Sequence, residues 1–182
     1  MTDRNPSCDG ADADANAETA PDFVAVSGLP GVGKTTVAKA VADRLDATLL
    51  RSDVVRKELV AEPAYSDAET ERVYAELFRR ARACVADGEG VVLDATFRHT
   101  SLRERARGVA TEADAAFTMV KVECDRATAR ERIRSRTGDE SDADVAVYRT
   151  LRKEYDEMTG AHVVVDNSGS VAKTHERVAE LF

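Results

Sequence analysis

The 182-residue sequence contains no long hydrophobic run, few cysteines and no tryptophan. No apolar stretch approaches the ~20 residues that cross a bilayer, and the N-terminus lacks the hydrophobic stretch of a secretory signal. The three cysteines are far apart and form no CxxC pair, which excludes a disulfide framework and a zinc ribbon. The three histidines are equally scattered, so any metal is expected to arrive with a ligand. We expect a cytoplasmic protein with no membrane partner.

Acidic residues are concentrated at the N-terminus of the chain. Residues 1–22 hold six acids against one base, which leaves 28 acids and 25 bases in the rest. This near-balanced remainder offers no global basic surface, so we expect no binding to long nucleic acids. Residues 1–22 also contain too little apolar surface to offset the entropy of ordering. We therefore expect a disordered acidic tail over 1–22 and one domain over 23–182, of unknown oligomeric state.

From Phe23 onward, short β-rich apolar runs alternate with helical stretches, as is typical of an α/β fold with a parallel sheet covered on both faces. The predicted strands cover residues 23–27, 48–51, 90–94, 117–122 and 162–166. The predicted helices cover residues 34–45, 54–59, 67–87, 101–112, 126–136, 144–157 and 171–182. Five strands are expected to form one sheet.

The most specific functional signal is Gly28-Leu-Pro-Gly-Val-Gly-Lys-Thr35, which fits the phosphate-binding pattern G-x-x-x-x-G-K-[ST]. It lies between a predicted strand and a helix that begins near Lys34, where its backbone N–H groups can point at phosphate oxygens. Lys34 would reach the β- and γ-phosphates, and the Thr35 hydroxyl would ligate Mg²⁺. The alternative is a chance Gly-rich turn. The predicted cofactors are ATP and Mg²⁺, with the nucleotide bound by Gly28, Leu29, Pro30, Gly31, Val32, Gly33, Lys34, Thr35 and Thr36.

Two carboxylates follow predicted strands. Asp94 comes after three apolar residues, which is the usual arrangement for a carboxylate that holds Mg²⁺ near the phosphates; a loop cap or a base are its other possible roles. Asp53 lies at the C-terminus of the second strand, one helical turn before Arg56. Asp53 could accept a proton from an acceptor hydroxyl while Arg56 clamps an anionic group of the substrate. Alternatively, Ser52 or Asp53 serves only as a helix N-cap.

Five arginines lie between residues 126 and 136, ahead of a polar, Gly-containing stretch. A positively charged helix that leads into such a loop is typical of a mobile lid that supplies an arginine to the transferred phosphoryl group. Arg132 and Arg136 are one helical turn apart and are the residues we expect in these roles, Arg132 on the nucleotide and Arg136 in catalysis. The other three are expected to form a solvated helix face.

Taken together, these segments resemble the small P-loop kinases that include polynucleotide 5′-kinases, gluconate kinase, chloramphenicol phosphotransferase and zeta toxins. The resemblance implies a three-layer P-loop NTPase fold with sheet order 2-3-1-4-5 and an Arg-bearing lid. It also implies that Asp53 is the base that activates the acceptor hydroxyl and that lid arginines contact ATP phosphates. The implied function is ATP- and Mg²⁺-dependent transfer of the γ-phosphoryl group to a hydroxyl, or a phosphate, of a small-molecule or nucleotide acceptor.

Narrower relatives offer an alternative. Arg56 and the run Asp94-Ala-Thr-Phe-Arg98 also resemble nucleoside monophosphate kinases, in which two such arginines clasp the acceptor phosphate. The Asp53-x-x-Arg56 spacing is shared with adenylylsulfate kinases. The chain lacks the Gly-Phe-Pro-Arg and Lys-Gly-Leu-Tyr runs of those two groups. These resemblances add Arg98 to Asp53 and Arg56 as expected substrate-binding residues.

Other classes of nucleotide-binding protein fit less well. A regulatory GTPase would need an Asn-Lys-x-Asp tetrapeptide, which does not occur in this sequence. A nucleotide-binding regulatory or toxin-like module without small-molecule turnover remains an alternative, with the acidic tail as its docking element. Against this alternative, mere binding does not require a carboxylate on the acceptor side.

Overall fold

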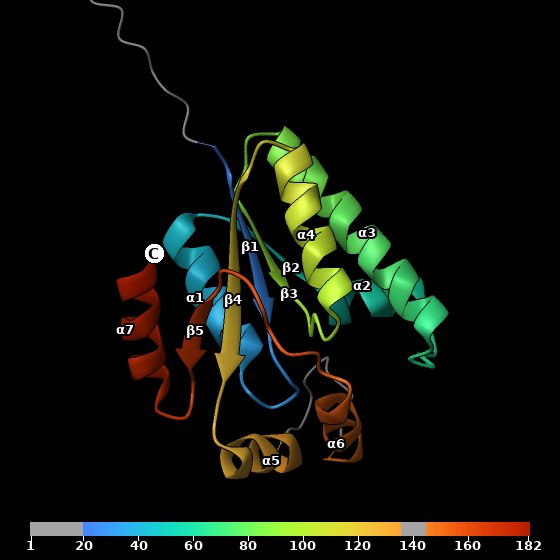
Figure 1. Ribbon diagram of the computed structural model, residues 1–182, viewed down its shortest axis with the longest axis vertical. Helices are drawn as coiled ribbons and strands as arrows, with labels where there is room; N and C mark the ends of the chain where they lie inside the picture. Colours follow the sequence, from blue (N-terminus) through green and yellow to red (C-terminus); the bar gives the residue numbers. More distant parts are fainter. Residues whose placement is uncertain (1–19, 136–144) are drawn as a thin grey trace, which may run out of the picture.

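The computed structural model describes residues 20–135 and 145–182, which form five strands and seven helices (Figure 1). In chain order these are β1 (Asp22–Ser27), α1 (Lys34–Leu45), β2 (Thr48–Arg51), α2 (Ser52–Leu59), α3 (Asp67–Ala86), β3 (Val91–Asp94), α4 (Thr100–Glu112), β4 (Ala116–Glu123), α5 (Arg126–Ser135), α6 (Val145–Lys153), β5 (Val163–Asp166) and α7 (Val171–Leu181). Among the helices of these two ranges, none has the length and apolar character needed to cross a bilayer.

The five strands form one parallel sheet in the order β2-β3-β1-β4-β5, which confirms the expected topology. The central strand β1 pairs with β3 on one side and with β4 on the other. In a parallel sheet all carboxyl ends meet at one edge, so the segments that follow β1, β2 and β3 are brought together there. Helices α5 and α6 lie beyond this same edge (Figure 1).

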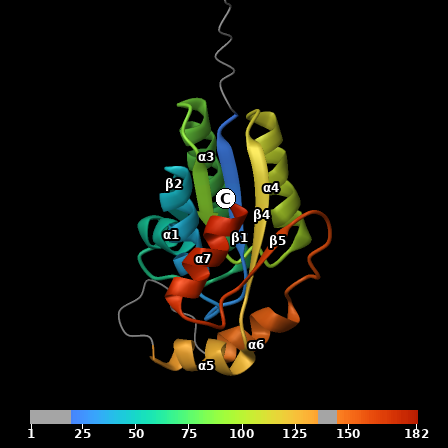
Figure 2. The same ribbon diagram turned by 90° about the vertical axis from the view of Figure 1, so that its left-hand side faces the viewer.

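The two faces of the sheet are covered by different helices, as the alternating side chains of β1 show. Phe23 and Ala25 point into a core made with α3 and α4, whereas Val24 and Val26 point into a core made with α1 and α7. Figure 2 shows α1 and α7 on the face turned toward the viewer. This three-layer arrangement buries both sides of the sheet, and open α/β sheets of this kind bind ligands at the carboxyl edge.

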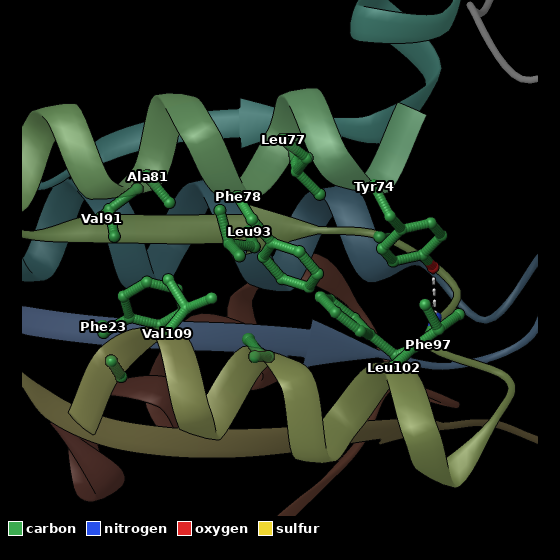
Figure 3. Packing of buried hydrophobic residues seen from close by; sticks show 14 of the residues in the cluster. Phe23, Tyr74, Leu77, Phe78, Ala81, Val91, Leu93, Phe97, Leu102 and Val109 are labelled. Carbon is green, nitrogen blue, oxygen red and sulfur yellow. Dashed lines mark hydrogen bonds between the residues drawn. The ribbon is translucent and has the colours of Figure 1, made fainter. Parts of the chain in front are cut away.

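An aromatic cluster supports the turn that follows β3. The side chains of Tyr74, Phe78 and Phe97 are buried together, with the rings of Tyr74 and Phe97 edge to face at 5.4 Å (Figure 3). The backbone N–H of Phe97, a residue with φ of 45°, donates to the Tyr74 hydroxyl at 2.9 Å. Burial raises the pKa of Tyr74 far above its ordinary value. Phe97 is therefore a core residue that sets the course of the chain toward Arg98.

Several boundaries differ from the sequence-based expectation. β1 begins at Asp22, within the expected tail, because Asp22 pairs with Ala116; residues 1–19 lie outside the described ranges. The helix expected over 144–157 ends at Lys153, and the chain then runs without regular structure to β5. The Asp156 N–H donates to the Arg98 carbonyl at 2.9 Å instead of continuing the helix. This tertiary hydrogen bond accounts for the early end of α6.

Candidate active site

The loop between β1 and α1, which with Lys34 and Thr35 we call the P-loop (residues 28–35), lies at the carboxyl edge of the sheet. The N–H groups of Thr36 and Val37 both donate to the Gly33 carbonyl, which closes the first turn of α1 directly after the loop. Lys34 Nζ donates to the Leu29 carbonyl at 3.2 Å and thus folds back over the loop. Backbone N–H groups and the positive end of α1 give this loop the properties of an anion site.

Two glycines let neighbouring elements approach the P-loop closely. A Cβ on Gly31 (φ +81°) would lie 2.5 Å from the Ala129 carbonyl oxygen of α5. A Cβ on Gly33 (φ +86°) would overlap the side-chain amide of Asn167, in the loop that follows β5. The P-loop is therefore packed between the predicted lid helix α5 and the β5–α7 loop.

Thr35 and Asp94 bring two oxygens together beside the P-loop. The Thr35 hydroxyl donates to Asp94 Oδ2 at 2.6 Å, and Arg51 Nε lies 3.5 Å from the same oxygen. Asp94 is buried. Mg²⁺ prefers oxygen ligands and keeps several waters or phosphate oxygens, so this pair fits its chemistry. Within the described residues there is no cluster of three or more His, Cys, Asp or Glu side chains, so a cation here would depend on further oxygens, such as those of a nucleotide.

Asp53 lies in the first turn of α2, close enough to Lys34 for their charges to interact. The helix begins at Ser52 with Arg51 as its N-cap, so neither Ser52 nor Asp53 is the capping residue. Burial raises the pKa of the Asp53 carboxyl, partly offset by the charge of Lys34, and the nearby Asp94 carboxylate raises it further. Asp53 is thus a half-buried carboxyl within the electrostatic reach of both the P-loop lysine and the Asp94 oxygens.

Arg56 is buried in an ion pair between α2 and α3. Its Nη1 donates to Glu69, and its guanidinium lies 4.7 Å from the centre of the Tyr65 ring. The other oxygen of Glu69 accepts from the N–H groups of Ala64 and Tyr65, at 2.8 and 3.1 Å. Arg56 is therefore tied to the loop that joins the two helices. Its role in binding the acceptor stays a prediction, and it would require a rearrangement of this pair.

Arg98 also has acidic neighbours. Its guanidinium lies 3.3 Å from Asp67 at the start of α3 and 3.8 Å from Glu154, and its Nε donates to His99 at 2.8 Å. Asp67 is almost fully exposed, so this pair is weaker than the buried one at Arg56. Arg98 can exchange its partners for a substrate anion at lower cost than Arg56 can.

The predicted lid enters the site through Arg132. Its Nη1 donates to the Val32 carbonyl of the P-loop at 3.5 Å, so α5 brings this arginine beside the expected phosphate site. Arg136 lies outside the described residues, and its predicted role stays a prediction.

Two side chains that the sequence did not single out lie against the P-loop region. Asn167 is buried and donates to the Val32 carbonyl at 2.8 Å. Tyr155, in the stretch that follows α6, shares a 2.7 Å hydrogen bond with Ser27 at the end of β1. Asn167 comes directly after β5, so the rule that ligands bind at the carboxyl ends of parallel strands was the available signal. Tyr155 offered no comparable signal.

The chain matches a known protein family and resembles known structures. The family model AAA_33, described as an AAA domain, matches residues 23–158. An uncharacterized protein of Mycobacterium tuberculosis (strain H37Rv) is 32% identical over 138 residues, which are 69% of this chain and 28% of that protein. The chain therefore spans little more than a quarter of the curated relatives that it matches.

Solved structures of kinases share the architecture. A gluconokinase from Sinorhizobium meliloti 1021 is 21% identical with a TM-score of 0.67, covering 90% of this chain and 94% of that chain. The Mycobacterium tuberculosis APS kinase CysC, in complex with AMPPNP and APS, is 21% identical with a TM-score of 0.69, covering 90% and 98%. These likenesses and the sheet order confirm the predicted fold. The chain belongs to the AAA_33 family of AAA domains and has the fold of the small P-loop kinases.

Proposed function

We propose that this protein is an ATP- and Mg²⁺-dependent kinase that transfers the γ-phosphoryl group to a hydroxyl group of a small-molecule or nucleotide acceptor. The observation that carries the proposal is the position of Asp53. It is a carboxyl group beside Lys34 and Asp94, it caps no helix, and its pKa is raised by burial. Nucleotide binding alone does not require such a group, whereas transfer to a hydroxyl requires a proton acceptor.

Each residue has a defined part in this reaction. The P-loop amides and Lys34 would hold the β- and γ-phosphates, and Thr35 and Asp94 would hold Mg²⁺, which would neutralise phosphate charge. The acceptor oxygen forms a bond to the γ-phosphorus as the bond from that phosphorus to the leaving ADP oxygen breaks. Asp53 takes the proton of the acceptor hydroxyl. Arg132 and Arg136 contribute positive charge from the lid in the closed state.

Transfer of labelled γ-phosphate across an acceptor panel tests the proposal. The panel contains 5′-hydroxyl oligonucleotides, nucleoside monophosphates, adenylylsulfate, sugar acids and amino-sugar-like alcohols. With an acceptor that is turned over, we expect Asp53→Asn to lower kcat by about 10²–10⁴ because a general base is lost. The matched control is Asp43→Asn, an exposed acid on α1, which should keep the wild-type rate. Wild-type kcat in Asp53→Asn would refute the base.

The second candidate is transfer to a nucleotide acceptor that carries a phosphate or a sulfate group, such as a nucleoside monophosphate or adenylylsulfate. Arg56 and Arg98 follow β2 and β3 at the edge where an acceptor would lie, and the APS kinase CysC has a similar fold. However, both arginines are already paired with carboxylates. This pairing favours an acceptor that presents a hydroxyl and carries no phosphate or sulfate group. Faster transfer to nucleoside monophosphates or adenylylsulfate than to neutral alcohols would reverse this order.

A regulatory nucleotide-binding module is the remaining alternative. Such a module would bind ATP–Mg²⁺, and its only labelled product would be phosphate released by hydrolysis of ATP. Binding without transfer to any acceptor of the panel is the result that would favour it over a kinase.

A further inference from the structure

Asn167 is buried against the P-loop, although no step of the proposed transfer uses it. Its Nδ2 donates to the Val32 carbonyl at 2.8 Å, and its Oδ1 accepts from the Thr174 hydroxyl of α7 at 2.5 Å. Its own N–H donates to the Glu123 carbonyl at the end of β4 at 2.7 Å. Both ends of the side-chain amide are thus occupied, which fixes its orientation.

The Val32 carbonyl belongs to the same peptide unit as the N–H of Gly33. In a planar trans peptide these two groups point in opposite directions. When Asn167 holds the carbonyl on its side of the loop, the Gly33 N–H is therefore directed away from Asn167. Gly33 has a φ of +86°, and it leaves room for the Asn167 amide where a Cβ would overlap it.

A second donor reaches the same carbonyl but holds it less tightly. Arg132 Nη1 lies 3.5 Å from the Val32 oxygen, compared with 2.8 Å for Asn167 Nδ2. Arg132 is also the lid residue proposed to contact ATP phosphates. Once Arg132 turns to the nucleotide, Asn167 is the donor that remains on Val32.

We propose that Asn167 is a positioning residue for the nucleotide: it holds the Val32 carbonyl so that the Gly33 N–H points toward the phosphates, and Thr174 holds Asn167 in turn. The proposal rests on the nucleotide-binding part of the proposed function and is independent of which acceptor is used.

Calorimetric titration of the full chain with AMPPNP–Mg²⁺ tests the proposal without any turnover. We expect Asn167→Ala to weaken binding about tenfold, the effect of one buried hydrogen bond that is not replaced. Thr174→Val should weaken it severalfold, and Thr174→Ser should restore wild-type affinity. The matched control is Thr111→Val on α4, whose exposed hydroxyl donates to the Arg107 carbonyl at 3.0 Å. This control should bind AMPPNP like the wild type.

Two further measurements separate positioning from a general loss of structure. The double variant Asn167→Ala/Thr174→Val should bind no more weakly than Asn167→Ala alone, because Thr174 acts only through Asn167. In the transfer assay, KM for ATP should rise in Asn167→Ala while kcat stays within about twofold, as for lost uniform binding. If Asn167→Ala does not fold, Asn167→Asp keeps the volume and the Thr174 contact but removes the donor to Val32.

The outcomes are distinguishable. Tight AMPPNP binding by folded Asn167→Ala or Asn167→Asp, equal to that of the wild type, overturns the role of Asn167. A loss of AMPPNP affinity in Thr111→Val equal to that in Asn167→Ala also overturns it. A wild-type chain that binds AMPPNP but transfers phosphate to no acceptor overturns the kinase alone, whereas a wild-type chain that binds no AMPPNP overturns both proposals.

Discussion

At Asp53, the proposed catalytic role and the stability of the fold make opposite demands. Burial raises its pKa above the ordinary value of 3.8, so the folded chain binds a proton at this site more readily than the unfolded chain does. Below the unfolded pKa both states are protonated and the site costs nothing. As the pH rises through the raised folded pKa, the carboxylate ionises inside the fold and its desolvation lowers the free energy of unfolding.

We therefore expect Asp53→Asn to be more stable than the wild type at pH 7, because the amide has no charge to desolvate. The gain should shrink as the pH falls toward 3.8, where the unfolded Asp is also protonated. Urea unfolding of both proteins between pH 4 and pH 7 measures the difference. Asp43→Asn, at an exposed position, serves as the control and should show no such trend. A less stable Asp53→Asn at pH 7 would show that the carboxylate is held by favourable contacts.

At the scale of elements, Arg103 joins the start of α4 to the stretch that follows α6. Its guanidinium donates to the carbonyls of Phe97 and Glu157 at 3.0 and 2.9 Å and to the Thr100 hydroxyl at 2.9 Å. The side chain is buried and lies over the Tyr155 ring at 5.6 Å. One arginine thus satisfies carbonyls from two segments that are far apart in the sequence.

Arg103→Met should lower the free energy of unfolding by about 2–4 kcal/mol, because it leaves the buried Phe97 carbonyl and the part-buried Glu157 carbonyl without their charged donor. Arg103→Lys should recover only part of the loss, since an ammonium cannot reproduce the planar fork. Arg82→Met is the control: Arg82 pairs with Glu112 on the surface, and its loss should cost about 0–1 kcal/mol. Urea denaturation gives these values. Equal losses at both positions would contradict a special role for Arg103.

The helices and strands, and the residues that lie in sequence motifs, could be predicted from the sequence because their signals are local. The helix Lys34–Leu45 and the strand Thr48–Arg51 are observed with the predicted bounds, and the strand ends bring Thr35 and Asp94 together. The Arg56–Glu69 pair was not predictable, because it depends on how two helices meet rather than on a spacing. The contact of Asn167 with Val32 spans 135 positions, so no local pattern could reveal it.

At the scale of the whole molecule, ligand binding should raise the free energy of unfolding. A ligand at 100 times its Kd raises the free energy of unfolding by about 2.7 kcal/mol, which corresponds to roughly 5–10 °C in Tm for a domain of this size. We expect this shift with ATP–Mg²⁺ and its loss in Lys34→Ala. Lys39→Ala, an exposed position on the same helix, should keep it. Thermal unfolding with and without nucleotide provides the measurement, and an unshifted wild-type Tm would contradict nucleotide binding.

The order of the strands also has a consequence for synthesis of the chain. The P-loop is complete once residue 35 has been made, but its strand β1 pairs with β3 and β4, and Asn167 follows β5. A nascent chain on the ribosome therefore carries the P-loop long before the partners that shape it exist. Because non-local parallel pairing is slow to form, nucleotide is expected to be captured only after the last strand has emerged. On the proposed function, ATP would therefore stabilise only chains in which all five strands have formed.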